Sequence, residues 1–135
     1  MNIYSKIEPE EVLHIIHRKA DFSDDRNDLV DWNNYLQCAT LKMPKGKTFK
    51  PHKHIIQKGS NKVIAQESWV VIRGSVKVTL YDLDDTILHE DILVAGDISI
   101  TLYGGHNYCI MEDDTLVYEF KTGPYYGQQL DKVFI

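Results

Sequence analysis

The sequence predicts an all-β domain preceded by a short helix. From residue 34 onward, short runs rich in β-branched and aromatic residues are separated by clusters of Gly, Pro, Asp and Asn, which is typical of strands and turns. Within residues 75–82, Val76, Val78 and Leu80 alternate with more polar neighbours, as expected for a half-buried strand. About seven to nine such strands with one leading helix indicate an antiparallel sandwich or barrel rather than an α/β sheet.

The first 33 residues are expected to differ from the rest. Residues 7–20 are predicted to form a helix, because Pro9 suits a first turn and three glutamates around it suit the positive end of the helix dipole. Apolar residues follow within 12–16 at the spacing of a helix face. Residues 21–33 are polar and acidic and are predicted to be a loop or arm. We therefore divide the chain into a helix and arm, 1–33, and a β-domain, 34–135.

The strands of the β-domain are placed between turn signals. Gly, Pro, Asp and Asn mark the turns, and residues 58–61 are predicted to be the turn of an extended hairpin. We expect strands at residues 35–43, 48–57, 62–73, 75–82, 87–94, 98–102, 106–111, 115–121 and 131–135.

A His-x-His pair, His52 and His54, lies on the second of these strands. Side chains two residues apart point to the same face of a strand, so the two imidazoles project together as a pair of metal ligands. On the next strand Glu67 shares a face with Trp69 and Val71. The Glu67 carboxylate is therefore a candidate third ligand in apolar surroundings.

The spacing around these residues resembles the first motif of the cupin family. Gly46 precedes His52 by six positions, and Gly74 follows Glu67 by seven, as in that motif. The gap between His54 and Glu67 holds twelve residues, which is longer than the family usually has.

A second, weaker resemblance follows in the segment that begins at Gly96. His106 stands where the second cupin motif has its histidine. Leu102 replaces the usual proline, and Ile110 stands where the motif has asparagine. The two resemblances together cover residues 34–121.

The resemblance implies a double-stranded β-helix, or jelly roll, and a metal site. By this resemblance the ligands would be His52, His54, Glu67 and His106. Imidazole and carboxylate donors suit one divalent transition metal, such as Zn, Mn, Fe or Ni, and do not choose among them. Four protein ligands leave a position for water or substrate, as in catalytic sites.

Three classes of function fit such a site. The first is an isomerase or epimerase acting on a sugar phosphate or nucleotide sugar, because residues 118–125 resemble the closing strand of small cupins associated with surface-polysaccharide metabolism. The second is an Fe(II)-dependent dioxygenase. The third is a binding module that holds a metal or sugar without chemistry. The residues leave these alternatives open.

Further site residues follow from position. Glu67 and Tyr108 are the candidate catalytic residues, since a tyrosine near His106 can donate or accept a proton. Trp69 and Tyr103 are candidate substrate-binding residues that wall the cavity. Lys50 is another, because it shares the parity of the two strand histidines and could lie at the pocket mouth.

Charge and composition limit the partners. The net charge of −5 argues against nucleic-acid binding, and no apolar run approaches the ~20 residues that cross a bilayer. Residues 32–66 contain seven lysines and no Asp or Glu. This segment is either a positive rim that attracts an anionic sugar substrate or a set of solvated strand faces and edges.

Location and assembly are also predicted. Two cysteines do not make a disulfide framework, and the N-terminus lacks an apolar signal segment, so a cytoplasmic protein is expected. The cupin resemblance further implies a homodimer. Trp32, at the end of the acidic arm, is a candidate packing or dimer contact.

Overall fold

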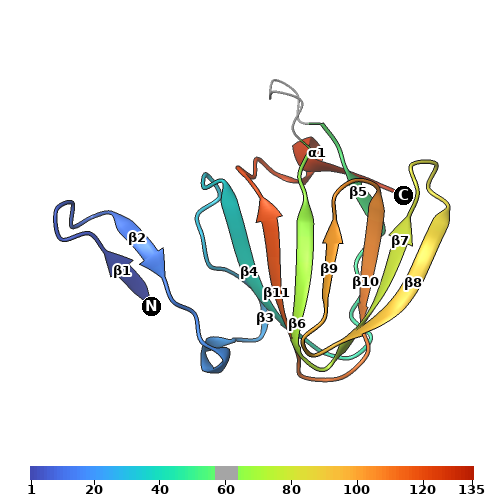
Figure 1. Ribbon diagram of the computed structural model, residues 1–135, viewed down its shortest axis with the longest axis horizontal. Helices are drawn as coiled ribbons and strands as arrows, with labels where there is room; N and C mark the ends of the chain where they lie inside the picture. Colours follow the sequence, from blue (N-terminus) through green and yellow to red (C-terminus); the bar gives the residue numbers. More distant parts are fainter. Residues whose placement is uncertain (57–63) are drawn as a thin grey trace.

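Two antiparallel sheets face one another in the computed structural model, which describes residues 1–56 and 64–135 (Figure 1). Each sheet has five strands. Sheet I has the order β3 (Asp25–Asp28), β4 (Leu36–Met43), β11 (Thr115–Thr122), β6 (Glu67–Arg73) and β9 (Ile98–Thr101). Sheet II has the order β12 (Lys132–Phe134), β5 (His52–His54), β10 (Gly105–Ile110), β7 (Ser75–Tyr81) and β8 (Ile87–Val94).

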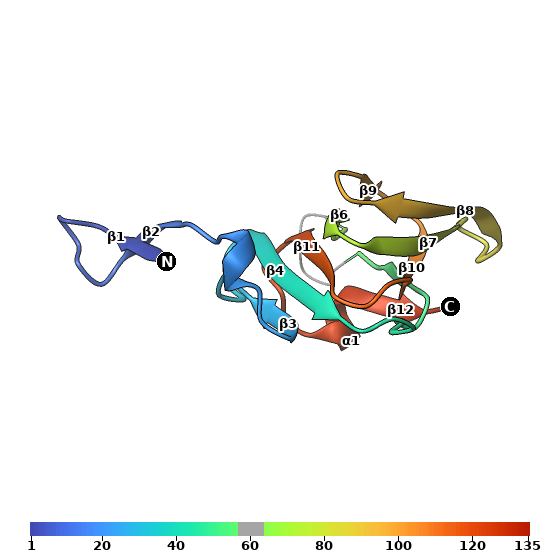
Figure 2. The ribbon, with the colours of Figure 1, turned by 90° about the horizontal axis from the view of Figure 1, so that it is seen from below.

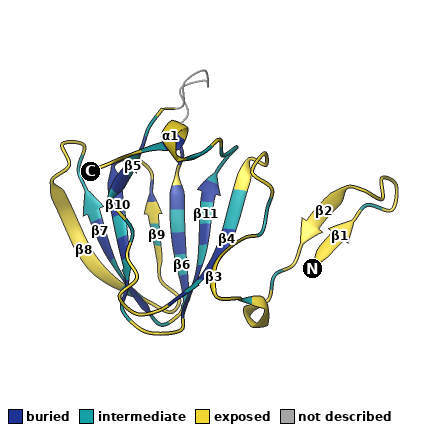
Figure 3. Cartoon of the chain, turned by 180° about the vertical axis from the view of Figure 1, so that it is seen from behind, coloured by how far each residue is buried: buried dark blue, intermediate teal, exposed yellow. Residues whose placement is uncertain are grey.

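The hydrophobic core fills the space between the two sheets. Every second residue of β6 is buried, so Glu67, Trp69 and Val71 share the inner face, as their spacing predicts. Aliphatic residues of β7, β10 and β11 meet them from both sheets. Figure 3 shows buried residues alternating with intermediate ones along much of β6 and β11, whereas β8 at the sheet edge is mostly exposed. Strand β5, with its buried His52 and His54, lies at the end of this inner face where Glu67 begins β6.

The predicted strands of the β-domain are confirmed in type and order. Residues 87–94 match β8 at both ends, and the others agree within a few residues except for the histidine strand, which is shortened to His52–His54. The extended hairpin expected between residues 48 and 73 is wrong in its pairing. An isolated bridge joins Ile56 and Ile64, but β5 then joins sheet II and β6 joins sheet I. The turn predicted at residues 58–61 lies outside the described residues.

The predicted N-terminal helix is wrong. Residues 7–20 contain β2 (Val12–Ile15), which pairs antiparallel with β1 (Asn2–Tyr4), and a 3-10 turn at Lys19–Asp21. Four of the five residues 12–16 are apolar, and such a short run fits a strand as well as a helix face. Ser5 Oγ accepts hydrogen bonds from two following backbone N–H groups and stabilises the intervening turn. The β1–β2 hairpin projects away from the two sheets (Figure 2).

The helix of the described chain lies near the other end of the sequence. It is α1 (Gln128–Asp131), a single turn next to β12. Figure 1 places it beside β5, at one end of the two sheets. Asp131 is 1% exposed. None of the described helices is long and apolar enough to cross a membrane.

The arm at residues 21–33 is also more regular than predicted. Residues Asp25–Asp28 form β3 instead of a loop and pair with β4 at the edge of sheet I. Trp32 is 58% exposed and packs edge-on against Tyr126, with ring centroids 5.7 Å apart. The arm therefore joins the sheet and places Arg26 near the interior.

Candidate metal centre

Four side chains from three strands converge between the sheets. His52 and His54 come from β5, and His106 lies directly opposite His52 on the neighbouring strand β10. Glu67 approaches from β6 of the opposing sheet. All four are buried, and their ligand atoms lie within 4.8 Å of one another. This group fits a divalent transition metal.

The two histidines that face one another across β5 and β10 are each held by one ring nitrogen. His52 Nδ1 lies 3.0 Å from the Lys50 carbonyl oxygen, which can only accept, so Nδ1 carries the proton and Nε2 has a free lone pair. Burial lowers the pKa of His52 to about 4, which keeps the imidazole neutral as a metal ligand must be. His106 Nδ1 lies 2.9 Å from Thr101 Oγ1. Such supports fix ring orientation at metal sites.

His54 lies between two carboxylates. Its Nε2 is 3.3 Å from Glu67 Oε2, and its Nδ1 is 3.3 Å from Asp131 Oδ2. Burial lowers the pKa of His54, but Asp131 and Glu67 outweigh it and raise the pKa to about 9. Burial raises the pKa of Glu67, while His106 and His54 together hold it well below its usual range. The site therefore presents an ionised carboxylate to three histidines, and His54 would release a proton when a metal binds.

Some ring nitrogens of this four-residue group have no hydrogen-bond partner among the described residues. Within residues 1–56 and 64–135, both ring nitrogens of His54 and Nε2 of His106 are buried without an aligned hydrogen-bond partner, although carboxylate oxygens lie 3.3 Å away. Buried polar atoms normally find partners, because leaving one unpaired costs about 1–3 kcal/mol. A bound cation would satisfy such nitrogens, because they could donate their lone pairs to it.

A cavity of about 520 Å³ lies beside this group. His52 and Glu67 line it. Trp69 also lines it and stacks on Tyr108, with ring centroids 4.0 Å apart, and its Nε1 donates to Glu67 Oε1 at 3.1 Å. The Tyr108 hydroxyl lies 2.6 Å from Ser99 Oγ, and burial raises the pKa of Tyr108. The aromatic pair thus supports Glu67 and forms an apolar wall.

Two predicted substrate-binding residues lie outside this cavity wall. The Lys50 side chain is exposed, and its Nζ lies 5.5 Å from the Phe134 ring centroid. Tyr103 is 67% exposed. Their roles remain predictions. Lys50 does contribute to the site, but through the backbone carbonyl that holds His52.

Comparison with known proteins defines the fold. No protein-family model and no curated protein sequence matches the chain. Among solved structures, a Klebsiella pneumoniae protein with a double-stranded β-helix domain has a TM-score of 0.58 at 16% identity, covering 87% of this chain and 88% of that one. KdgF from Halomonas sp. has a TM-score of 0.56 at 19% identity, covering 72% and 77%. Oxalate decarboxylase from Bacillus subtilis has a TM-score of 0.56 at 18% identity, covering 75% of this chain and 24% of that one.

The protein has the cupin fold. At these identities the likeness establishes the fold alone. This cupin spans about a quarter of the length of oxalate decarboxylase. The metal-binding character rests on its own four side chains.

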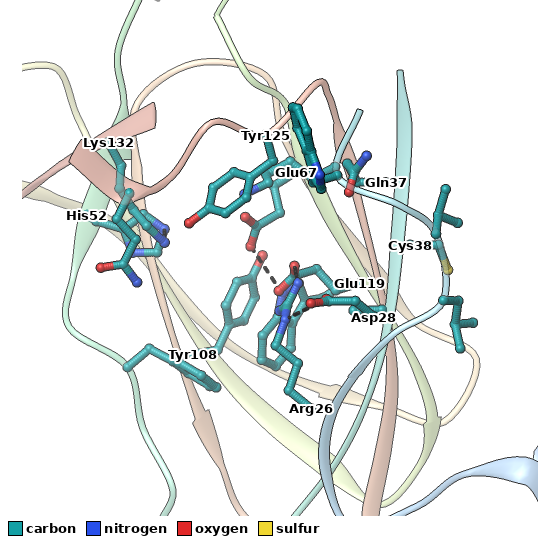
Figure 4. Close-up of a pocket in the computed structure, with 18 of the residues that line it drawn as sticks. Arg26, Asp28, Gln37, Cys38, His52, Glu67, Tyr108, Glu119, Tyr125 and Lys132 are labelled. Atoms are coloured by element: carbon teal, nitrogen blue, oxygen red, sulfur yellow. Dashed lines mark hydrogen bonds and ion pairs between the residues drawn. The ribbon is translucent and has the colours of Figure 1, made fainter. Parts of the chain in front are cut away.

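Sequence reasoning missed several charged residues around the cupin cavity. Arg26 contacts Glu119 through Nη2 and Asp28 through Nε, each at 2.9 Å. Lys121 contacts buried Asp131 at 3.2 Å, and Lys132 also lines the cavity. Figure 4 shows Arg26, Asp28 and Glu119 on one side of the pocket and His52 and Lys132 on the other. Glu119 alone carried a signal, because it falls among apolar residues of a predicted strand.

Proposed function

We propose that this cupin binds one divalent transition metal through His52, His54, Glu67 and His106 and acts as an isomerase or epimerase on a sugar phosphate or nucleotide sugar. The observation that carries the proposal is the convergence of buried imidazole nitrogens without hydrogen-bond partners among the described residues. They lie beside a cavity whose size is within the range of small-molecule sites.

The residues around the cavity suit a polar ligand. A metal at this site would polarise a carbonyl oxygen and stabilise negative charge that develops next to it. Glu67 and Tyr108 are the proposed proton carriers. Burial raises the pKa of Tyr108, so its hydroxyl is protonated at neutral pH and can donate a hydrogen bond to a ligand oxygen. The amides of Gln37 and Asn107 line the same space and can bond sugar hydroxyl groups.

The fold neighbours are compatible with such a ligand. Oxalate decarboxylase acts, by its name, on a small dicarboxylate, so this fold can accommodate an anionic ligand. Three imidazoles and one carboxylate also suit an Fe(II) dioxygenase or a metal-holding module without turnover. The metal that the chain retains would separate these classes.

The first experiment measures metal content by elemental mass spectrometry on the untagged protein. We expect about one transition metal per chain, lost in His52→Ala/His54→Ala, because two of four donors disappear. The matched control is His14→Ala/His89→Ala, which removes two exposed histidines and should retain the metal.

The identity of the metal then ranks the functions. Zinc, manganese or nickel with conversion of an aldose phosphate to its ketose or epimer would support the isomerase. Iron with oxygen consumption would favour the dioxygenase. Absence of metal after reconstitution with all four ions would overturn the proposal.

We also propose that the cupin forms a homodimer through its β1–β2 hairpin. The hairpin exposes Val12, Leu13 and Ile15. In sheet I, Leu36 at the start of β4 and Ile100 on the edge strand β9 are also exposed. Exposed apolar surfaces of this kind often mark protein contacts.

The dimer is tested by deleting residues 1–16, which leaves β3 intact. Light scattering after size exclusion should give twice the chain mass for the full chain and a single chain mass for the deletion. A dimer unchanged by the deletion would exclude the hairpin as the contact. A monomeric full chain would exclude the dimer.

A further inference from the structure

Lys132 lies next to the metal ligands on the inner side of sheet II. Strand β12 pairs with β5 so that Lys132 is opposite His54 and Phe134 is opposite His52. The Lys132 ammonium lies 3.5 Å from His52 Nε2, and Figure 4 shows the two side chains together at one side of the cavity. His52 Nε2 is the nitrogen with the free lone pair, since Nδ1 faces the Lys50 carbonyl.

Lys132 differs from the other cations around the cavity in how its charge is paired. Arg26 is balanced by Glu119 and Asp28, and Lys121 by Asp131. In the part of the chain that the structure describes, Lys132 has no carboxylate oxygen within 4.0 Å. Its polar neighbour is the His52 lone pair, which a metal ion would take. The ammonium then needs another acceptor beside the ion.

We infer that Lys132 binds an oxyanion of a small ligand whose adjacent oxygen binds the metal held by the four-residue group. This inference rests on the proposed metal site and deepens it. The ligand class is a molecule with an oxyanion next to a second oxygen donor, as in the α-hydroxy carboxylate of a sugar acid. A charged hydrogen bond at such a partly buried position is stronger than a neutral one.

With this contact, the negative charge of the ligand lies at the metal end of the cavity. The lysine-rich segment at residues 32–66 offers a different location, at the outer rim. Lys50 represents that rim, because its exposed side chain lies over Phe134 and does not line the cavity. Lys45, an exposed lysine of the same segment that does not line the cavity, is the matched control for Lys132.

The test uses the full chain loaded with Co(II), whose visible absorption reports ligand binding. Glycolate is the anionic chelating probe, and imidazole is a neutral metal-binding probe. We expect Lys132→Met to weaken glycolate binding about 10- to 100-fold, the range of a charged hydrogen bond. Its affinity for imidazole should stay within about twofold. Lys132→Arg should retain most of the glycolate affinity, and Lys45→Met, which changes an exposed lysine of the same segment, should match the unmodified protein.

The possible outcomes distinguish a failure of the Lys132 role from a failure of the metal site. Unchanged glycolate affinity in cobalt-loaded Lys132→Met would overturn the role of Lys132 and leave the metal site intact. Equal losses in Lys132→Met and Lys45→Met would also overturn it, because they would indicate a general effect of charge. Failure of the unmodified chain to take up cobalt would overturn the metal site and this inference together.

Discussion

Two polar clusters face the same cavity, and they differ in burial and in how completely their charges are paired. Arg26, Asp28 and Glu119 form one cluster, in which the cation has two carboxylates at 2.9 Å. The four metal-ligand candidates form the other. There both ring nitrogens of His54 and Nε2 of His106 lack an aligned hydrogen-bond partner among the described residues.

The difference shows what each cluster can do. An ion pair whose partners are matched needs no further group, and the Arg26–Glu119 pair links β3 to β11 within sheet I. A buried polar atom without a hydrogen-bond partner lowers the stability of the fold until another atom binds to it. The first cluster is therefore structural, and the second is prepared for an ion.

The largest effect is expected from exchanging one carboxylate in each cluster for its amide. Glu67→Gln should weaken metal binding more than about 100-fold, because even residues outside the coordination shell typically contribute 10–100-fold. Glu119→Gln is the matched control and should retain metal. Competition with a chromogenic chelator measures both affinities. Equal affinity in the two variants would erase the distinction between the clusters.

A smaller effect is expected from Arg26→Met. It leaves Glu119 buried without its cation, which typically costs 3–5 kcal/mol. The Arg26 side chain is 43% exposed, so water screens part of its interaction with Glu119. We therefore expect the free energy of unfolding to fall by about 2 kcal/mol. Urea denaturation of the metal-free protein measures it. In Arg26→Met/Glu119→Gln the loss should be less than the sum of the single losses; strict additivity would contradict the pairing.

The smallest effect is expected from Asp131→Asn. The change removes the charge 3.3 Å from His54 Nδ1, which supports one ligand from outside the coordination shell. We expect metal affinity to fall about tenfold, at the low end for such support. Asp85→Asn, which alters the exposed partner of Lys53, should leave affinity unchanged. An effect as large as that of Glu67→Gln would indicate that Asp131 is itself a ligand.

Much of the fold could be predicted because its signals are local. Alternation along each strand gave the inner face of β6, and the spacing of His52, His54 and Glu67 gave most of the metal group. The N-terminal hairpin was not predictable in this way, since the apolar run of residues 12–16 is too short to distinguish a helix from a strand.

The rest of the site depends on pairing between distant segments. Strand β3 consists of polar residues only, so no alternation of hydrophobicity marks it or points Arg26 inward. Lys132 reaches the metal group because β12 pairs with β5, about 80 residues earlier in the chain. Such a register is set by the assembled sheets and leaves no signal in the sequence around Lys132.

The metal ligands come from both sheets, with β5 and β10 on one side and β6 on the other. A bound ion would therefore join the two halves of the sandwich. A ligand that binds only the folded chain adds about 2.7 kcal/mol of stability at 100 times its dissociation constant. Proteases act mainly on opened chains, so the supply of metal would govern how long each copy of this protein survives in the cell.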